Sequence, residues 1–300
     1  MRAADPSYGR DVQRIALASV LVLVLAAACG GTADEPPSST PEPDDPSGRI
    51  AYNCGEEARQ VCLIEADGTG AERVTGTALQ VEAPAWDATG ESVVVARVEG
   101  DAFRLYRLDL GSGAQEALTR PGRLAYYGRP SPDGTRLLFV CGDLEDSDLC
   151  IANADGTGVG VVVASPFHEL DPAWSPDGTQ IAFSRISDEQ GPQVFLAAAD
   201  GSGERSLAPG ITPSWSPDGE TIAVAGGALY RVDVESGRAT PLTEGFDLEP
   251  SWSPDGRWIV FRRGELPDAS LYLVRADGTD ERRLTPPGEP AVLPSWSPTG

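Results

Sequence analysis

The sequence of 300 residues contains no lysine and only one histidine. Its 23 basic residues are therefore all arginine, and 46 acidic residues give a formal net charge of −23. This charge argues against a nucleic-acid partner, because such binding requires basic patches that neutralise phosphates. With His168 as the single histidine, a Ser-His-Asp triad or a histidine-based zinc site is a poor interpretation, and we expect no metal and no cofactor.

The sequence also lacks the Gly-x-Ser-x-Gly elbow of α/β-hydrolases, and nothing around His168 indicates a nucleophile. We therefore expect a protein that is not an enzyme. Aspartate and glutamate are plentiful, so a carbohydrate-active enzyme, a glycosidase or lyase with acidic catalytic residues, stays open as the alternative. No pair of carboxylates stands out for that role.

Long apolar runs are missing as well, since crossing a bilayer takes about 20 residues. The run from Ile15 to Ala28 has 14 residues, follows a basic start and ends in small residues, as an export signal does. Its end, Leu-Ala-Ala-Ala-Cys-Gly, resembles the lipobox of bacterial lipoproteins and implies a signal peptide over residues 1–28 with lipid attached to Cys29. Leucine usually stands where this chain has Ala26, so an ordinary signal peptide with an incidental cysteine is the alternative.

Residues 29–48 are rich in proline, serine, threonine, aspartate and glutamate and contain no large apolar residue. Such a segment cannot bury enough apolar surface to fold alone. We expect a disordered acidic tether that holds a globular domain, residues 49–300, clear of a membrane.

The domain is organised around a repeated turn, Trp-Ser-Pro-Asp-Gly. The closing glycines of successive copies are 44, 44, 41, 37 and 44 residues apart. A period near 40 marks a repeat architecture, in which each repeat buries its apolar face against its neighbours. The copies, some of them weaker, begin at Trp86, Pro130, Trp174, Trp215, Trp252 and Trp296.

Each copy predicts a set of strands and turns. Ser-Pro-Asp-Gly suits a type I turn followed by a left-handed glycine. An apolar run such as Ile181 to Phe183 follows, and then a second turn signal such as Asp200 to Gly203, which is typical of strands joined by a hairpin.

The two ends of the domain are complementary. Arg49 to Tyr52 matches the strand that elsewhere follows the turn, and Gly300 directly follows the last turn. The sequence therefore predicts an all-β, six-bladed propeller with four antiparallel strands per blade, closed by N- and C-terminal strands that share one blade. An open β solenoid or a truncated chain is the alternative.

The repeat, with the Arg-Arg-Leu-Thr of Arg282 to Thr285, resembles the WD40-like repeat of TolB-type β-propellers over residues 49–300. TolB is a periplasmic partner of a peptidoglycan-associated lipoprotein and has an extra α/β domain, so its partner contacts are not carried over. The resemblance implies a binding module more than an activity, since propellers host many functions. We expect a monomeric, membrane-anchored extracytoplasmic lipoprotein that binds a protein or a cell-envelope glycan. The third repeat departs from the pattern with Pro130 in place of tryptophan.

Four cysteines are expected to form two disulfides, Cys54–Cys62 and Cys141–Cys150. The two segments align without a gap, so each pair flanks the same hairpin in a different blade. Opposed residues of an antiparallel pair lie close enough for a bridge, and export permits oxidation. Four buried free thiols, or a shared metal site, are the alternatives.

The links between repeats vary in length and content, whereas the turns at the other end are repetitive. Function usually lies on variable loops held by a rigid scaffold, and in a propeller these links meet at one mouth of the central channel. Carboxylates beside aromatics there would suit a cationic group, a divalent ion or a sugar face, and ordinary solvated loop charge is the alternative. The candidate binding residues are Glu82, Tyr127, His168, Asp171, Asp247 and Glu249.

The lipid anchor can be tested by replacing Cys29 with serine. We expect the variant to enter the soluble fraction or to remain an uncleaved precursor, because two or more acyl chains anchor a protein stably and their loss removes that anchor. Membrane fractionation and the mass of the mature chain measure this. Unchanged membrane retention and processing would contradict lipidation.

Overall fold

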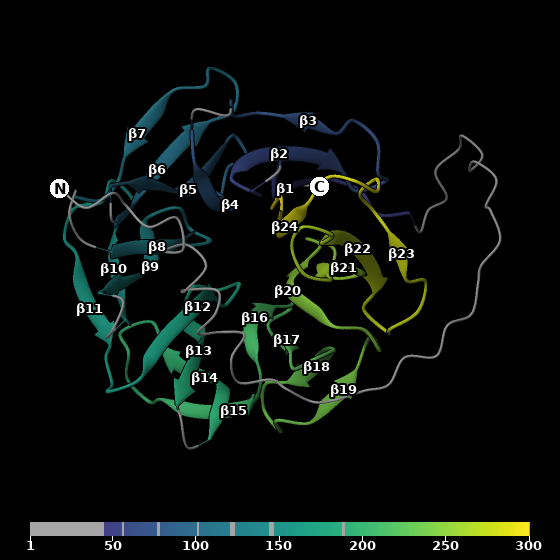
Figure 1. Ribbon diagram of the computed structural model, residues 1–300. Coiled ribbons are helices and arrows are strands. Elements are labelled where there is room, and N and C mark those ends of the chain that lie inside the picture. Colours follow the sequence, from purple (N-terminus) through teal and green to yellow (C-terminus); the bar gives the residue numbers. More distant parts are fainter. Residues whose placement is uncertain are drawn as a thin grey trace.

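The computed structural model describes residues 45–299, except 56, 77–78, 101, 121–123, 144–146 and 188–189. The expected signal peptide, Cys29 and most of the expected tether lie outside the described residues. Six four-stranded antiparallel sheets are arranged as blades around a common centre (Figure 1), which confirms the predicted fold.

Every blade is a meander whose strands follow one another from the centre outward. Blade 1 contains β24 (Ala291–Trp296), β1 (Arg49–Cys54), β2 (Gln60–Glu65) and β3 (Glu72–Arg73). Blade 2 contains β4 (Val81–Trp86), β5 (Ser92–Glu99), β6 (Ala102–Asp109) and β7 (Gln115–Ala117). Blade 3 contains β8 (Leu124–Pro130), β9 (Arg136–Gly142), β10 (Ser147–Asn153) and β11 (Gly160–Val163).

The other three blades repeat this order. Blade 4 contains β12 (His168–Trp174), β13 (Gln180–Ser187), β14 (Gly191–Ala198) and β15 (Arg205–Pro209). Blade 5 contains β16 (Ile211–Trp215), β17 (Thr221–Ala225), β18 (Leu229–Asp233) and β19 (Ala239–Pro241). Blade 6 contains β20 (Asp247–Trp252), β21 (Trp258–Arg263), β22 (Ser270–Arg275) and β23 (Arg282–Arg283).

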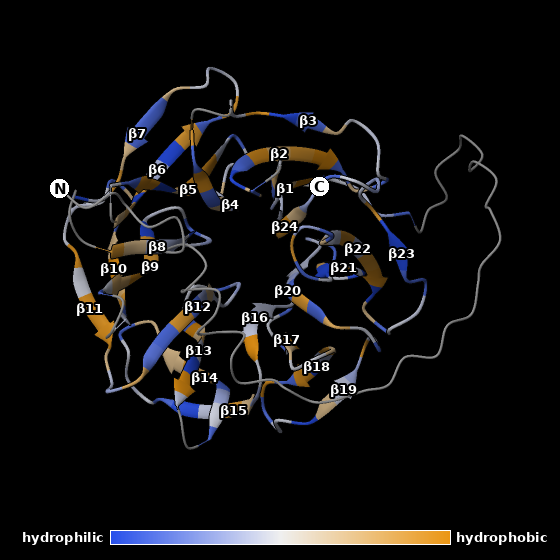
Figure 2. Ribbon diagram, viewed as in Figure 1, coloured by the Kyte–Doolittle hydropathy of each residue, from blue (hydrophilic) through white to orange (hydrophobic). Residues whose placement is uncertain are grey.

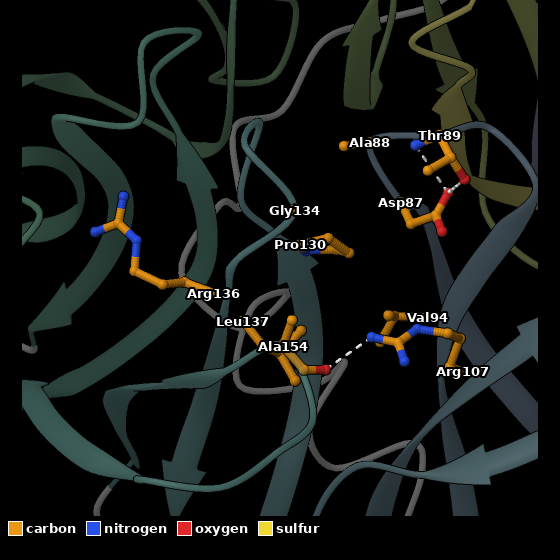
Figure 3. Close-up of a pocket in the computed structure, with 10 residues that line it drawn as sticks. All are labelled: Asp87, Ala88, Thr89, Val94, Arg107, Pro130, Gly134, Arg136, Leu137 and Ala154. Carbon is orange, nitrogen blue, oxygen red and sulfur yellow. Dashed lines mark hydrogen bonds between the residues drawn. The ribbon is translucent and has the colours of Figure 1, made fainter.

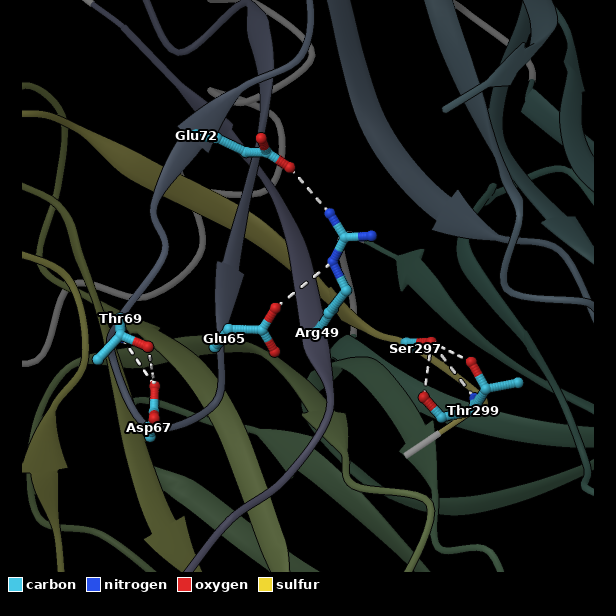
Figure 4. A network of polar contacts seen from close by, with 7 residues as sticks. All are labelled: Arg49, Glu65, Asp67, Thr69, Glu72, Ser297 and Thr299. Atoms are coloured by element: carbon cyan, nitrogen blue, oxygen red, sulfur yellow. Dashed lines mark hydrogen bonds and ion pairs between the residues drawn. The ribbon is translucent and has the colours of Figure 1, made fainter. Parts of the chain in front are cut away.

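Blade 1 closes the ring by pairing the two ends of the domain. β24 lies antiparallel to β1, with Trp296 opposite Ile50 and Ala291 opposite Cys54. Beside this pairing, Arg49 contacts Glu65 at 3.7 Å and Glu72 at 2.9 Å (Figure 4). These ion pairs are exposed and contribute little, so the strand pairing itself holds the closure.

The meander gives the propeller two different faces. The turn face carries the Ser-Pro-Asp-Gly and Asp-Gly turns. The link face carries the segments that join blades, together with the hairpins between the second and third strands. Figure 2 shows that hydrophobic residues concentrate in the inner strands, whereas the outermost strands β3, β7 and β23 are hydrophilic.

The Ser-Pro-Asp-Gly motif forms the type I turn that the sequence predicts. In blade 4 the Gly178 N–H donates to the Ser175 carbonyl at 2.9 Å, and the Ser175 hydroxyl donates to the Asp177 carboxylate at 2.6 Å. The same hydroxyl accepts the Gln180 N–H at 2.9 Å. The bond from Ser175 is the main cause that lowers the pKa of Asp177, so the charged form is stabilised inside the turn.

The motif tryptophans pack between blades. The indole N–H of Trp174 donates to the Arg129 carbonyl of blade 3 at 3.0 Å, and Trp252 makes the equivalent bond to Ser214 of blade 5 at 3.1 Å. Trp86 bonds to Ser295 of blade 1 at 2.9 Å. Each ring is buried, so the motif residue belongs to the junction with the preceding blade.

Both predicted disulfides are present. Cys54 and Cys62 link the β1–β2 hairpin with Cα atoms 5.9 Å apart, and Cys141 and Cys150 link β9 to β10 at 5.8 Å. The sequence led us to expect that the bridged residues lie directly opposite each other, but Cys54 faces Gln60 in the register. Each bridge runs diagonally across its strand pair instead, which the twist of the hairpin allows.

The glycine of an Asp-Gly turn lies against the backbone of the preceding blade. A Cβ atom at Gly156 would lie 1.6 Å from the Leu118 carbonyl oxygen, and one at Gly201 would lie 1.8 Å from that of Val162. Both glycines also have positive φ, 80° and 84°. The glycine that recurs in these turns therefore reflects close packing between blades as well as turn geometry.

We expect Gly156→Ala to lower the free energy of unfolding by about 2–5 kcal/mol, the sum of left-handed strain and overpacking. The matched control is Gly203→Ala, since Gly203 also has positive φ but no atom within 4 Å of the added carbon. That control carries only the strain, about 1–2 kcal/mol. Urea unfolding measures both, and equal losses would show that blade contact is not the reason for glycine.

Candidate functional site

Six innermost strands surround the centre of the ring, and each has one residue with positive φ, between 49° and 57°. At each of these positions the pairing with the second strand shifts register, for example between Leu170 and Ala173. Such bulges re-aim a side chain and turn its backbone N–H away from the ladder. We call these residues the central ring: Ala83, Tyr127, Asp171, Thr212, Glu249 and Leu293.

Hydrogen bonds connect the central ring from blade to blade. The Thr212 N–H donates to the Asp171 carboxylate at 3.3 Å, and the Glu249 N–H donates to the Thr212 hydroxyl at 3.3 Å. The Leu293 N–H donates to the Glu249 carboxylate at 2.6 Å. The polar side chains of one blade thus satisfy the bulged backbone of the next.

At the junction of blades 1 and 2 a buried amide has the same role. The Ala83 N–H donates to the Asn53 side-chain oxygen at 2.8 Å, and the Asn53 amide donates to the Val81 carbonyl at 2.8 Å. Asn53 has no exposed surface, so these bonds are formed away from water. A buried polar group is stable only when it is satisfied in this way.

Two arginines form ion pairs with carboxylates near the centre. One lies on the second strand of its blade, and the other lies in the hairpin that follows such a strand. Arg59 lies 3.2 Å from Glu82, and Arg262 lies 3.2 Å from Glu249. The Tyr126 hydroxyl also donates to Glu82 at 2.9 Å. Arginines therefore neutralise these two carboxylates, although the chain as a whole is strongly acidic.

Tyr127, Arg129 and Asp171 interact with one another near the centre. The Arg129 guanidinium lies 5.7 Å from the centroid of the Tyr127 ring. Burial raises the pKa of Asp171 to about 6, against the opposing hydrogen bonds from Ser184 and Thr212. Burial also raises the pKa of Tyr127 well above its ordinary value and lowers that of Arg129.

The structure brings together four of the six candidate residues and separates two. Glu82, Tyr127, Asp171 and Glu249 lie on four of the six innermost strands, β4, β8, β12 and β20, and the other three interact electrostatically with Tyr127. Asp247 is fully buried, and Arg263 clamps its carboxylate at 2.7 and 2.8 Å. The Asp247 side chain therefore does not line the mouth of the central channel. It points into its own blade toward Arg263, the residue opposite it in the strand register.

His168 also lies apart from the central ring. It is the first residue of β12, and its Nδ1 lies 3.2 Å from the Ser147 hydroxyl of blade 3. Ser147 is itself buried and reaches the Glu169 carbonyl at 3.4 Å. This histidine thus contributes to the contact between blades 3 and 4.

Sequence reasoning missed Arg59, Arg129, Arg262 and Thr212. A sequence signal could have identified Thr212. Five of the six central-ring residues, Thr212 among them, stand directly before the motif Pro-x-Trp. Proline has no N–H to leave unpaired beside the bulge. No comparable signal marks the arginines, because their roles depend on strands that meet only in the fold.

Three large apolar side chains are exposed on the link face. Phe167 precedes β12, Phe246 precedes β20, and Leu266 lies in the hairpin between β21 and β22; their exposed fractions are 40%, 37% and 36%. Val159 and Val161 are exposed elsewhere, at the outer edge of blade 3. The link face therefore combines apolar anchors with the charged centre.

Two further properties concern only the part of the chain that the structure describes. There, no group of three or more histidine, cysteine, aspartate or glutamate side chains is placed to hold a metal ion. No helix in that part is long and apolar enough to cross a membrane.

Comparisons with known proteins agree with the fold. The family profile of the TolB beta propeller domain matches residues 135–300, more than half of the chain. The chain belongs to this family.

Two curated relatives carry the TolB name. A protein TolB homolog from Chlorobaculum tepidum is 29% identical over 210 residues, which cover 69% of this chain and 38% of that protein. A Tol-Pal system protein TolB from Methylococcus capsulatus is 33% identical over 161 residues, which cover 44% of this chain and 38% of that protein. The match thus spans about two fifths of each relative.

Solved structures support the fold alone, at identities below 25%. TolB from Acinetobacter baumannii superimposes with a TM-score of 0.72 at 22% identity, over 84% of this chain and 67% of that one. A chain of a nidogen/laminin complex gives 0.69 at 11% identity, over 83% and 98%. An oligogalacturonate lyase in complex with manganese gives 0.54 at 17% identity, over 75% and 70%.

The raised pKa of Asp171 predicts a pH dependence. The folded state holds this proton more tightly than the unfolded chain, so ionisation of Asp171 lowers the free energy of unfolding as the pH rises from about 4 to 7. The loss is about 3 kcal/mol at most. Relative to Asp171→Asn, the parent should therefore become less stable across this range.

Denaturant unfolding of both proteins at several pH values measures the difference. Asp177→Asn is the control, because the pKa of Asp177 is lowered and the parent should then lose stability, relative to that variant, as the pH falls. A pH-independent difference between the parent and Asp171→Asn would contradict the burial of an ionisable carboxyl at the centre.

Proposed function

We propose that this protein is a lipid-anchored, extracytoplasmic binding module that holds a partner protein of the cell envelope on its link face. The observation that carries the proposal is the set of exposed apolar side chains around the charged centre. Aromatic anchors beside polar groups are typical of protein-binding surfaces.

The curated relatives support a protein partner. One of them is named a Tol-Pal system protein, and the family match covers the propeller of this chain. Because the match spans 38% of that relative, a partner like those of the relative is only a proposal for this chain. The acceptor for lipid would be Cys29, and residues 29–48, if extended, would span roughly 60 Å at about 3.1 Å per residue.

The chemistry of the centre favours binding over catalysis. Glu82 and Glu249 are each paired with an arginine, and Asp171 accepts bonds from Ser184 and Thr212. Carboxylates engaged in this way hold blades together, whereas a glycosidase needs two that act on the substrate. We therefore place the carbohydrate-active alternative second, and an envelope glycan is the competing ligand.

A photo-crosslinking phenylalanine analogue at position 246 tests the proposal in cells that produce the full chain. Phe246 is exposed on the link face, so we expect covalent adducts with an envelope protein, identified by mass spectrometry. The same analogue at Val159, exposed on the outer edge of blade 3, is the matched control and should give none of these adducts.

Three results would count against a protein partner on this face. Equal adducts from both positions would indicate nonspecific contact, and no adduct from position 246 would remove the site. Adducts with glycan alone would replace the protein with a carbohydrate ligand.

A further inference from the structure

The residue directly before the repeated turn is small in five blades and large in one. In blade 3 it is Arg129, whereas the other blades have alanine or serine, namely Ala85, Ala173, Ser214, Ser251 and Ser295. The Arg129 carbonyl accepts the Trp174 indole N–H, as the backbone carbonyls of small residues do at other junctions. Because that bond uses only the backbone, the packing of the blades does not account for the long side chain. Blade 3 therefore carries a guanidinium group where the other blades have none.

The Arg129 side chain extends toward the centre of the ring. Its guanidinium interacts electrostatically with Tyr127 of its own blade, with Asp171 of blade 4 and with Glu249 of blade 6. Blade 6 lies across the ring from blade 3 (Figure 1), so a group that senses both Asp171 and Glu249 lies near the middle. Arg129 and Tyr127 are both partly exposed. Solvent, and therefore a small ligand, reaches them.

Hydrogen-bond donors without acceptors gather at this point. A guanidinium group has five N–H donors, and none of those of Arg129 donates to another residue in the described part of the chain. Within the same part of the chain, the Tyr127 hydroxyl also has no hydrogen-bond partner. Arg59 and Arg262, in contrast, each lie 3.2 Å from a carboxylate oxygen. Arg129 and Tyr127 therefore present free donors to whatever occupies the centre.

Partial removal from water makes these free donors unfavourable. Burial lowers the pKa of Arg129 and raises the pKa of Tyr127, because each charged form loses solvation. Polar groups removed from water are normally satisfied by a partner. Hydrogen bonds are also stronger in such surroundings than in bulk water. A ligand that accepts them therefore gains more here than at an exposed arginine.

The neighbouring charges determine which acceptor fits. Two parallel N–H groups of a guanidinium match the two oxygens of a carboxylate. Asp171 and Glu249 interact with Arg129, and only Glu249 has an arginine partner within the described residues, Arg262 at 3.2 Å. Their negative charge repels a doubly charged phosphate about twice as strongly as a singly charged carboxylate. The centre therefore favours a single carboxylate group.

We propose that Arg129 and Tyr127 form a binding site for a carboxylate group at the centre of the propeller. The guanidinium donates two N–H bonds to the carboxylate oxygens, and the Tyr127 hydroxyl donates a third. This site lies inside the ring and is independent of the partner proposed for the link face. A free small carboxylic acid and the carboxyl terminus of a peptide share this chemistry.

The test is nuclear magnetic resonance of the ¹⁵N-labelled full chain with acetate, N-acetyl-diglycine and N-acetyl-diglycinamide, which lacks the carboxylate. At constant ionic strength, we expect the acids to shift the Arg129 Nε–H signal and the backbone amide signals of Tyr127 and Thr212 in a saturable way. The dissociation constant should be on the order of 10 mM or tighter for such small ligands. Binding of N-acetyl-diglycine identifies a site that accepts a peptide terminus, whereas binding of acetate alone identifies a site for free acids.

Arg129→Ser gives blade 3 the small residue that other blades have at this position, and it should weaken acid binding by about tenfold or more. Arg97→Ser is the matched control. Arg97 lies on the second strand of blade 2, is partly exposed and contacts the Tyr106 ring at 5.2 Å, and it donates no hydrogen bond within the described residues. Because it lies away from the central ring, its loss should leave binding unchanged.

Asp171→Asn removes a negative charge beside the site and should strengthen acid binding by about threefold or more. Misfolding cannot produce a gain in affinity, so this variant tests the proposal even if Arg129→Ser does not fold. Four results would overturn the proposal: no saturable shift with either acid, equal shifts with the amide, unaltered affinity in folded Arg129→Ser, or no gain in Asp171→Asn. Tighter binding of phosphate than of acetate would overturn the assignment to a carboxylate.

Discussion

The structure depends on close packing between neighbouring blades in a closed ring. Each blade presents its strands edge-on to the centre and buries both faces against other blades, so no blade is complete alone. The pairing of β24 with β1 completes blade 1 and closes the ring, so that every blade has a neighbour on both sides. Glycine at the Asp-Gly turns and tryptophan at the junctions between blades determine how closely adjacent blades pack.

This constraint divides the molecule into a face that must repeat and a face that can vary. The turn face carries the glycines and tryptophans, and its sequence changes little between blades. The centre and the link face carry the bulged residues, whose side chains differ in every blade. Left-handed backbone at residues such as Thr212 and Leu293 costs about 1–3 kcal/mol each, and the bonds between blades offset part of it. The polar groups are therefore structural supports first, and they present charge at the centre as a consequence.

The sequence predicted those parts of the structure that depend on local chemistry and regular spacing. Turn glycines at a period near 40 determine the number of blades, and Cys54 and Cys141 occupy matching places in two aligned hairpins. The candidate site was only partly predictable. Asp247 is an acidic link residue in the sequence, but its burial depends on Arg263, which is brought opposite by strand register.

Pro130 is a second example of a feature that the sequence predicts only in part. Its departure from the repeat is visible in the sequence, whereas the hollow of about 110 Å³ that it lines with residues of blade 2 is visible only in the structure (Figure 3). Residues that act through a single neighbour in the chain can be recognised by motif. Residues such as Arg129 and Arg262, which act through strands from other blades, require the fold.

We propose that the link face, and not the repetitive turn face, receives the partner. Hydrogen–deuterium exchange of the full chain, measured alone and with envelope extract, distinguishes the two faces. We expect slower exchange in the partner-bound state at residues 165–168, 244–247 and 264–268, with no change at the turns 155–158 and 200–203. Protection confined to those turns would contradict it.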